Sequence, residues 1–284
     1  MLTEAKPWLD GFDERTTRSD GTEIRYLVGG SGAPLMLVHG LGGCAANWSE
    51  LAPRLAARRR VLVPELPGHG GSSPPGSATT AALAAGVGAV LECERVVPAP
   101  VVGHSLGGVL ALRLALGWPE LVSGLVLAAG AGISSGTPRT RRTLGVLGVL
   151  RPARRISRWR AAIGRSPTLT GLAFSPLLVS DPRSLSPRSV DGFLCGHRHH
   201  TDWRSASRAL VADDPRSALA AVRCPALVLW GANDRQLPLD DAFDYARRLR
   251  APLRVVPDCG HLLIGERPDA CLDAIETFLR THEI

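Results

Sequence analysis

Short, largely apolar runs separated by helix-length segments recur along this chain of 284 residues and constrain its fold more than any other feature. The runs occupy residues 35–38, 61–63, 100–102, 125–127, 226–229 and 253–256. Apolar runs without alternation are typical of strands that helices cover on both faces. Because strands that alternate with helices form parallel sheets, the pattern predicts a doubly wound α/β fold.

The stretches outside these runs predict the remaining elements of the fold. Residues 22–28 alternate polar and apolar side chains, as expected of an antiparallel edge strand with one solvated face. Helical patterns follow at 45–57, 80–91, 106–117, 239–249 and 269–279. Gly86 and Gly88 weaken the second of these helices, since glycine is a poor helix former.

Residues 134–216 interrupt the regular pattern. The segment has no convincing strand, and seven prolines divide it into short pieces, with helices predicted at 143–150 and 153–163. It follows the sixth strand, so we expect it to lie over the carboxyl ends of the strands as a helical, arginine-rich lid. The predicted organisation is therefore a core of residues 1–133 and 217–284 and a lid of residues 134–216.

Ser105 is the candidate nucleophile. It lies at the centre of a G-x-S-x-G motif, Gly103 to Gly107, between a predicted strand and a predicted helix. Such an abrupt turn strains the serine, and flanking glycines leave room for the neighbouring backbone. The start of the following helix would favour negative charge beside the serine.

Serine needs a base to take its proton, and that base needs an acceptor that holds it in one tautomer. Asp234 follows the strand at 226–229, and His261 follows the strand at 253–256, so both are predicted at the same sheet edge as Ser105. The order Ser, Asp, His is the one that this type of nucleophile turn requires. The rival acids are Asp240 and Asp241, which a helix start explains, and Asp258, which is close to His261 in sequence.

Four motifs in this order make the chain resemble the α/β-hydrolase superfamily, in particular its esterases, lactonases and carbon-carbon bond hydrolases. They are residues 39–43, residues 67–72, residues 230–238 with Asp234, and residues 260–268 with His261. The resemblance covers nearly the whole chain. It implies a mostly parallel sheet of eight strands and a Ser105, His261 and Asp234 triad without a cofactor.

The resemblance also implies further site residues. The backbone N–H groups of Leu41 and Leu106 would form the oxyanion hole, which binds the negative oxygen of the reaction intermediate. Around them, we expect substrate contacts from His39, Gly40, His104 and Trp48, although Trp48 is equally suited to packing under the lid. One departure is Glu65, where the family usually has Asp. Relatives with an aspartate nucleophile are disfavoured because position 105 is serine.

Composition and charge limit the possible partners. The net charge is +7 with a single lysine, and residues 134–216 hold fifteen arginines against five aspartates. This excess is either a solvated surface or a rim that attracts a small anionic or carrier-linked substrate. Nucleic-acid binding is disfavoured because no known motif accompanies the arginines.

Other patterns suggest no metal and no membrane span. Cys195, His197, His199 and His200 cluster within the predicted lid, but without further ligands we interpret them as an exposed turn. The six cysteines form no C-x-x-C pair, and no apolar run reaches the roughly 18 residues of a membrane span. The first seven residues do not resemble a signal peptide, so we expect a cytoplasmic protein.

These observations favour a serine hydrolase that cleaves an ester, thioester or lactone through an acyl-enzyme on Ser105. A carbon-carbon bond hydrolase acting on a vinylogous diketone would use the same triad. A non-hydrolytic acyltransferase or cyclase would use the same fold. The sequence around Ser105 does not separate the three, and it leaves the substrate and the oligomeric state open.

Overall fold

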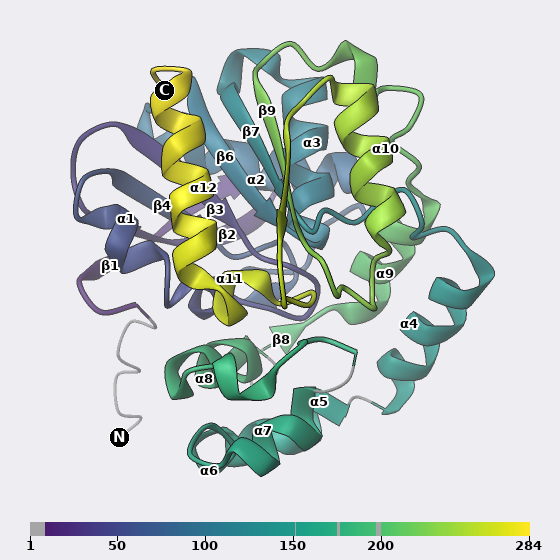
Figure 1. The fold of residues 1–284 in the computed structure, drawn as a ribbon. Helices are drawn as coiled ribbons and strands as arrows, with labels where there is room; N and C mark the ends of the chain where they lie inside the picture. The colour runs from purple at the N-terminus through teal and green to yellow at the C-terminus, as the bar shows by residue number, and fades with distance from the viewer. Residues whose placement is uncertain (1–8, 151, 175–176, 197–199) are drawn as a thin grey trace.

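The computed structural model describes residues 9–150, 152–174, 177–196 and 200–284. A single sheet of eight strands runs through its centre, in the order β1-β2-β4-β3-β6-β7-β9-β10 (Figure 1). The strands are β1 (Phe12–Ser19), β2 (Thr22–Gly29), β3 (Pro34–Val38), β4 (Arg60–Pro64), β6 (Ala99–His104), β7 (Val122–Ala128), β9 (Ala226–Gly231) and β10 (Leu253–Val256). The pairs from β4 to β10 are parallel, so the predicted doubly wound, mostly parallel sheet is confirmed.

Strand β1 was not predicted by the apolar pattern, and it makes the expectation of an edge strand at 22–28 wrong, because β2 lies between β1 and β4. It pairs antiparallel with β2, and most of its side chains are exposed, so it lacks the apolar run of the other strands. A two-residue turn, Asp20-Gly21, joins the pair, and both residues have positive φ angles of 45° and 75°. Asp-Gly turns of this kind favour a hairpin, which is the signal that identifies β1.

The core helices cover both faces of the sheet. Helices α2 (Thr80–Glu94) and α3 (Leu106–Gly117) pack against each other behind the sheet in Figure 1, and α12 (Pro268–Thr281) lies in front of it. Helix α10 (Leu239–Leu249) follows β9. The single helix expected at 45–57 is wrong: the structure has a 3₁₀ turn, η1 (Ala45–Trp48), and a short helix, α1 (Ala52–Ala56). Pro53 lies in the first turn of the second piece, because proline cannot donate the hydrogen bond that a continuous helix needs there.

The segment between β7 and β9 is largely helical. Its helices are α4 (Pro138–Leu150), α5 (Pro152–Ile156), α6 (Arg160–Gly164), α7 (Pro167–Phe174), α8 (Pro187–Cys195) and α9 (Trp203–Ala212). Four of these helices begin at a proline, since the first turn of a helix needs no hydrogen bond from that nitrogen. The prolines thus start helices, and the helix predicted at 153–163 is divided into α5, the 3₁₀ turn η3 (Ser157–Trp159) and α6.

The expectation of no strand in this segment needs one correction. Residues His200–Thr201 form a short strand, β8, which pairs antiparallel with β5 (His69–Gly70) in the core. Two residues are too few to show an apolar pattern. Further hydrogen bonds join the segment to core loops, from Asn47 to Gly192 O at 3.0 Å and from Asp202 N to Gly68 O at 2.7 Å. In the described ranges, no helix is both long enough and apolar enough to cross a bilayer.

Candidate active site

Ser105 occupies a strained turn between β6 and α3. Its φ angle is 54° and its ψ angle is −118°, a conformation that L-residues rarely adopt. Its backbone is held on both sides, because its N–H donates to Ala128 O at 3.1 Å and its carbonyl accepts from Ala131 N at 3.0 Å. The turn therefore fixes the direction of the Ser105 side chain.

The two glycines of the motif are required by close backbone contacts. A Cβ atom on Gly103 would lie 2.2 Å from Gly107 O, and one on Gly107 would lie 2.2 Å from Val38 O. Neither contact leaves room for a methyl group, since the opposing atoms belong to the backbone. The spacing of the motif thus has the steric cause that the sequence predicts.

Ser105, His261 and Asp234 form one hydrogen-bonded chain. The Ser105 Oγ lies 3.0 Å from His261 Nε2, and His261 Nδ1 lies 2.8 Å from Asp234 Oδ2. The side chains of His261 and Asp234 are 3% and 0% exposed, whereas Ser105 is half-buried. The structure thus brings together the three residues that the sequence placed on separate loops.

The surroundings of Asp234 keep it ionised. Burial alone would raise its pKa, but the adjacent His261 and the N–H groups of Gln236 and Leu237 hold the pKa of Asp234 below its ordinary value. Both N–H groups donate to Asp234 Oδ1 at 2.8 Å. A carboxylate in this position accepts the proton of His261 Nδ1, which leaves Nε2 free to accept the Ser105 proton.

The rival acids lie elsewhere. Asp240 and Asp241 are in the first turn of α10, and Asp241 Oδ2 accepts a hydrogen bond from Ser134 N at 3.1 Å. Asp258 is exposed and has a φ angle of 48°. None of the three is the partner of His261 Nδ1.

The loop after β3 approaches Ser105 closely. A Cβ atom on Gly40 would lie 3.1 Å from Ser105 Cβ, so the loop backbone lies against Ser105. Leu41 is half-buried in this loop, and Leu106 is the first residue of α3. Within the described residues, neither backbone N–H has a protein acceptor, and the start of α3 favours negative charge nearby.

His39 and His104 have protein partners within this region. His39 Nε2 accepts from Leu66 N at 3.1 Å, and Nδ1 donates to Gly40 O at 2.8 Å. His104 Nε2 lies 2.9 Å from His261 O. Burial lowers the pKa of each histidine to about 3, so both are neutral. These bonds hold Gly40 and His261 in place, while Trp48 is fully buried in η1.

Two buried glutamates were not predicted to support the site. Glu266 accepts from Gly260 N at 2.7 Å and from Ser180 N and Asp181 N at 2.8 Å each. Glu65 accepts from Gly71 N at 2.6 Å and pairs with Arg25 at 2.9 Å. Glu266 thus joins the loop before His261 to the inserted segment. No sequence pattern indicates this contact.

The structure shows no metal centre among the residues it describes. No group of three or more His, Cys, Asp or Glu side chains in the described ranges could hold an ion. His197 and His199 of the sequence cluster, and the first eight residues, lie outside those ranges.

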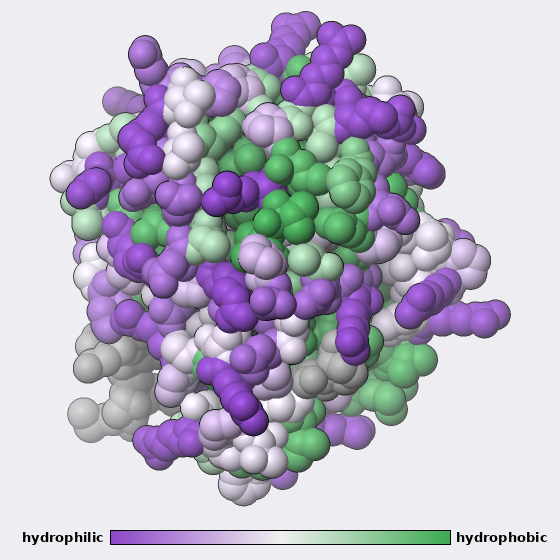
Figure 2. Space-filling model, viewed as in Figure 1, coloured by the Kyte–Doolittle hydropathy of each residue, from purple (hydrophilic) through white to green (hydrophobic). Residues whose placement is uncertain are grey.

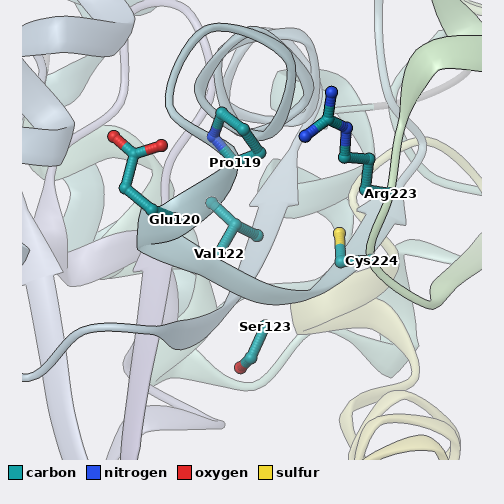
Figure 3. A pocket seen from close by; sticks show the side chains of 6 residues that line it. All are labelled: Pro119, Glu120, Val122, Ser123, Arg223 and Cys224. Atoms are coloured by element: carbon teal, nitrogen blue, oxygen red, sulfur yellow. The ribbon is translucent and has the colours of Figure 1, made fainter.

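A shallow surface pocket lies at the opposite end of β7 from Ser105 (Figure 3), lined by Pro119, Glu120, Val122, Ser123, Arg223 and Cys224.

Known proteins resemble this chain in sequence. Residues 35–274 match the alpha/beta hydrolase family. The chain is 30% identical over 267 residues to pyrrolizixenacetamide deacetylase of Xenorhabdus hominickii, covering 92% of this chain and 96% of that protein. It is 34% identical over 251 residues to 2-hydroxymuconate semialdehyde hydrolase of a Pseudomonas species, covering 82% and 81%.

A solved structure shows the same arrangement of elements. It is a thermophilic esterase from Thermogutta terrifontis, with a TM-score of 0.74 and 25% identity, covering 96% of this chain and 99% of that one. The resemblance found in the sequence is thus confirmed by the family match and by the structure. The chain therefore belongs to the alpha/beta hydrolase family, and it is an enzyme, a hydrolase.

Proposed function

We propose that this hydrolase cleaves an ester, thioester or lactone of small to medium size through an acyl-enzyme on Ser105. The observation that carries the proposal is the continuous hydrogen-bonded chain from Ser105 Oγ through His261 to the Asp234 carboxylate. A serine on a strained turn, an unprotonated base nitrogen and a buried carboxylate are what acyl transfer requires.

The reaction would proceed in two halves. Ser105 Oγ attacks the carbonyl carbon while His261 Nε2 takes its proton, and the N–H groups of Leu41 and Leu106 stabilise the oxygen that becomes negative. His261 returns the proton to the leaving group, and an acyl group remains on Ser105. Water then attacks this acyl group with help from His261, and the free acid leaves.

Residues 134–216 are proposed to act as the lid that selects the substrate, over the core of residues 1–133 and 217–284. The lid is joined to the site at its base, because Glu266 binds Ser180 and Asp181 as well as the loop of His261. Leu262 N also donates to Leu178 O at 3.0 Å. We therefore expect a movement of this part of the lid to shift the loop that carries His261. Its arginines suit an anionic or carrier-linked substrate.

Carbon-carbon bond hydrolysis is the second candidate. The 34% identity to 2-hydroxymuconate semialdehyde hydrolase favours it, and the residues around Ser105 suit both reactions. In that case Ser105 and His261 would act on a ketone, and the leaving group would be a carbon.

A hydrolysis screen tests both candidates. It would compare esters of increasing acyl length, thioesters, lactones, an acetamide and a vinylogous diketone, with Ser105→Ala as the negative control and Ser123→Ala as the matched control. We expect turnover of at least one ester, thioester or lactone, which is abolished in Ser105→Ala and kept in Ser123→Ala. Turnover of the diketone alone would favour the second candidate, and activity that survives Ser105→Ala would exclude both.

A further inference from the structure

The surface of residues 134–180 combines positive charge with exposed apolar side chains to a degree not found elsewhere among the described residues. These 47 residues contain nine arginines and no aspartate or glutamate. Of the nine large hydrophobic side chains that are exposed in the described residues, seven belong to this segment. They are Val146, Val149, Leu150, Trp159, Leu169, Leu172 and Leu177.

The exposed apolar side chains are arranged in stripes. Val146, Val149 and Leu150 share one face of α4, since residues three and four apart lie side by side on a helix. Leu172 on α7 is 77% exposed, and Leu169 lies one turn before it. Figure 2 shows apolar surface at the lower end of α4 and beside α7, next to hydrophilic side chains.

The arginines lie among these stripes and are mostly free of acidic partners. Arg139, Arg141 and Arg142 are exposed at the start of α4, and Arg154 and Arg155 are exposed on α5. In the described part of this segment, one arginine forms an ion pair, Arg160 with Asp191 at 2.5 Å. Arg158 lies 5.2 Å from the Trp159 ring, which places a cation beside an exposed aromatic side chain.

We propose that the 134–180 surface binds an anionic lipid bilayer. Helices that pair exposed apolar residues with arginine rest in the interface of a bilayer, with the apolar side chains among the acyl chains and the arginines on the headgroup phosphates. Tryptophan is favoured at the same depth because its ring is apolar and its N–H is polar.

Charge argues against the other occupants of an apolar surface. A second copy of this chain would place nine arginines opposite nine, with no acid in either segment to pair with them. A soluble acidic protein or a nucleic acid would satisfy the arginines, but it would not require seven exposed apolar side chains on several helices. An anionic bilayer satisfies both.

Vesicle co-sedimentation of the full chain tests the proposal. We expect binding to phosphatidylglycerol and phosphatidylcholine vesicles, and at least tenfold weaker binding to vesicles of phosphatidylcholine alone. Val149→Ser with Leu172→Ser should weaken binding by about tenfold. Arg154→Gln with Arg155→Gln should weaken it by about 25-fold, since each arginine near the surface contributes about fivefold.

Matched variants outside the surface provide the controls. Phe243→Ser removes an exposed apolar side chain from α10, and Arg18→Gln with Arg58→Gln removes two exposed arginines from the core. Both control variants should leave vesicle binding unchanged, and near-ultraviolet circular dichroism checks that every variant is folded.

Four results would overturn the proposal. One is no binding to the anionic vesicles, and another is binding that the control variants reduce as much as the test variants. The third is a concentration-dependent dimer in sedimentation equilibrium that Val149→Ser with Leu172→Ser abolishes. The fourth is binding to polyglutamate or duplex DNA that is as tight as vesicle binding and insensitive to the apolar substitutions.

Discussion

The sheet edge that carries Ser105 and the 134–180 surface differ in what their charged groups face. At the sheet edge, Asp234 and Glu266 are buried, and each accepts hydrogen bonds from named backbone N–H groups. On the 134–180 surface, arginines and large apolar side chains are exposed together. Buried charged groups with fixed hydrogen-bond donors hold a site in one geometry, whereas exposed charged groups determine which molecules the surface attracts. We therefore infer that the core carries out the chemistry and that the insertion binds the enzyme's partners.

Among the carboxylates of the core, Asp234 should be the most sensitive to loss of its charge, as in Asp234→Asn. An amide cannot hold His261 in the required tautomer, so kcat should fall by about 10⁴-fold with little change in fold. Steady-state kinetics would measure this. The matched control is Asp258→Asn, which alters the exposed rival acid. If Asp258→Asn were the more damaging of the two, the assignment of the acid would be wrong.

One substitution, glycine to alanine, should act in opposite directions in the two regions. Gly103→Ala places its methyl against the Gly107 backbone and should destabilise the fold by about 3 kcal/mol. In Gly145→Ala, on α4, the methyl would meet nothing within 4 Å, and the change should stabilise the fold by about 0.5–1 kcal/mol. Urea unfolding measures both. If both variants changed the free energy of unfolding equally, the two regions would not differ in how tightly they are packed.

Glu266→Gln tests how the two regions are joined. A glutamine presents one oxygen, so it cannot accept from Gly260 N and from Ser180 N and Asp181 N at the same time. The free energy of unfolding should fall by about 1–3 kcal/mol. Because the loop before His261 and the inserted segment both lose hydrogen bonds to Glu266, kcat should fall as well. A variant with lower stability but wild-type kcat would show that Glu266 supports only the fold. The exposed Glu283→Gln is the control.

The smallest expected effect is the pH dependence of the Asp234 contribution to stability. The pKa of Asp234 is lower in the folded protein than its ordinary value. Ionisation therefore stabilises the fold above pH about 4, and this contribution is lost as the pH falls through the folded pKa. The difference in unfolding free energy between wild type and Asp234→Asn should shrink in that range. If the difference grew as the pH fell, the pKa of Asp234 would be raised by folding and not lowered.

Much of the core could be predicted from sequence, for a physical reason. Strands buried on both faces have to be apolar, and their order along the chain places Ser105, Asp234 and His261 at one edge. Strand β1 was missed because its side chains are mostly exposed, and only the Asp20-Gly21 turn indicates it. The break at Pro53 was missed because helical periodicity continues through it.

The supporting contacts could not be read from the sequence. Glu266 and Glu65 act through backbone N–H groups, and such contacts leave no pattern of side-chain types. The insertion was harder still, since its prolines suggest breaks but instead begin helices. Its exposed apolar stripes follow from the packing of α4 and α7, which periodicity alone does not give.

The most direct test of the central claim is covalent labelling of the folded enzyme with a fluorophosphonate, followed by mass spectrometry of the intact protein and its peptides. We predict one adduct, located on Ser105, with labelling lost in Ser105→Ala and strongly slowed in His261→Ala. Folded wild-type enzyme that gives no adduct at Ser105, or that is labelled equally fast in His261→Ala, would contradict the account.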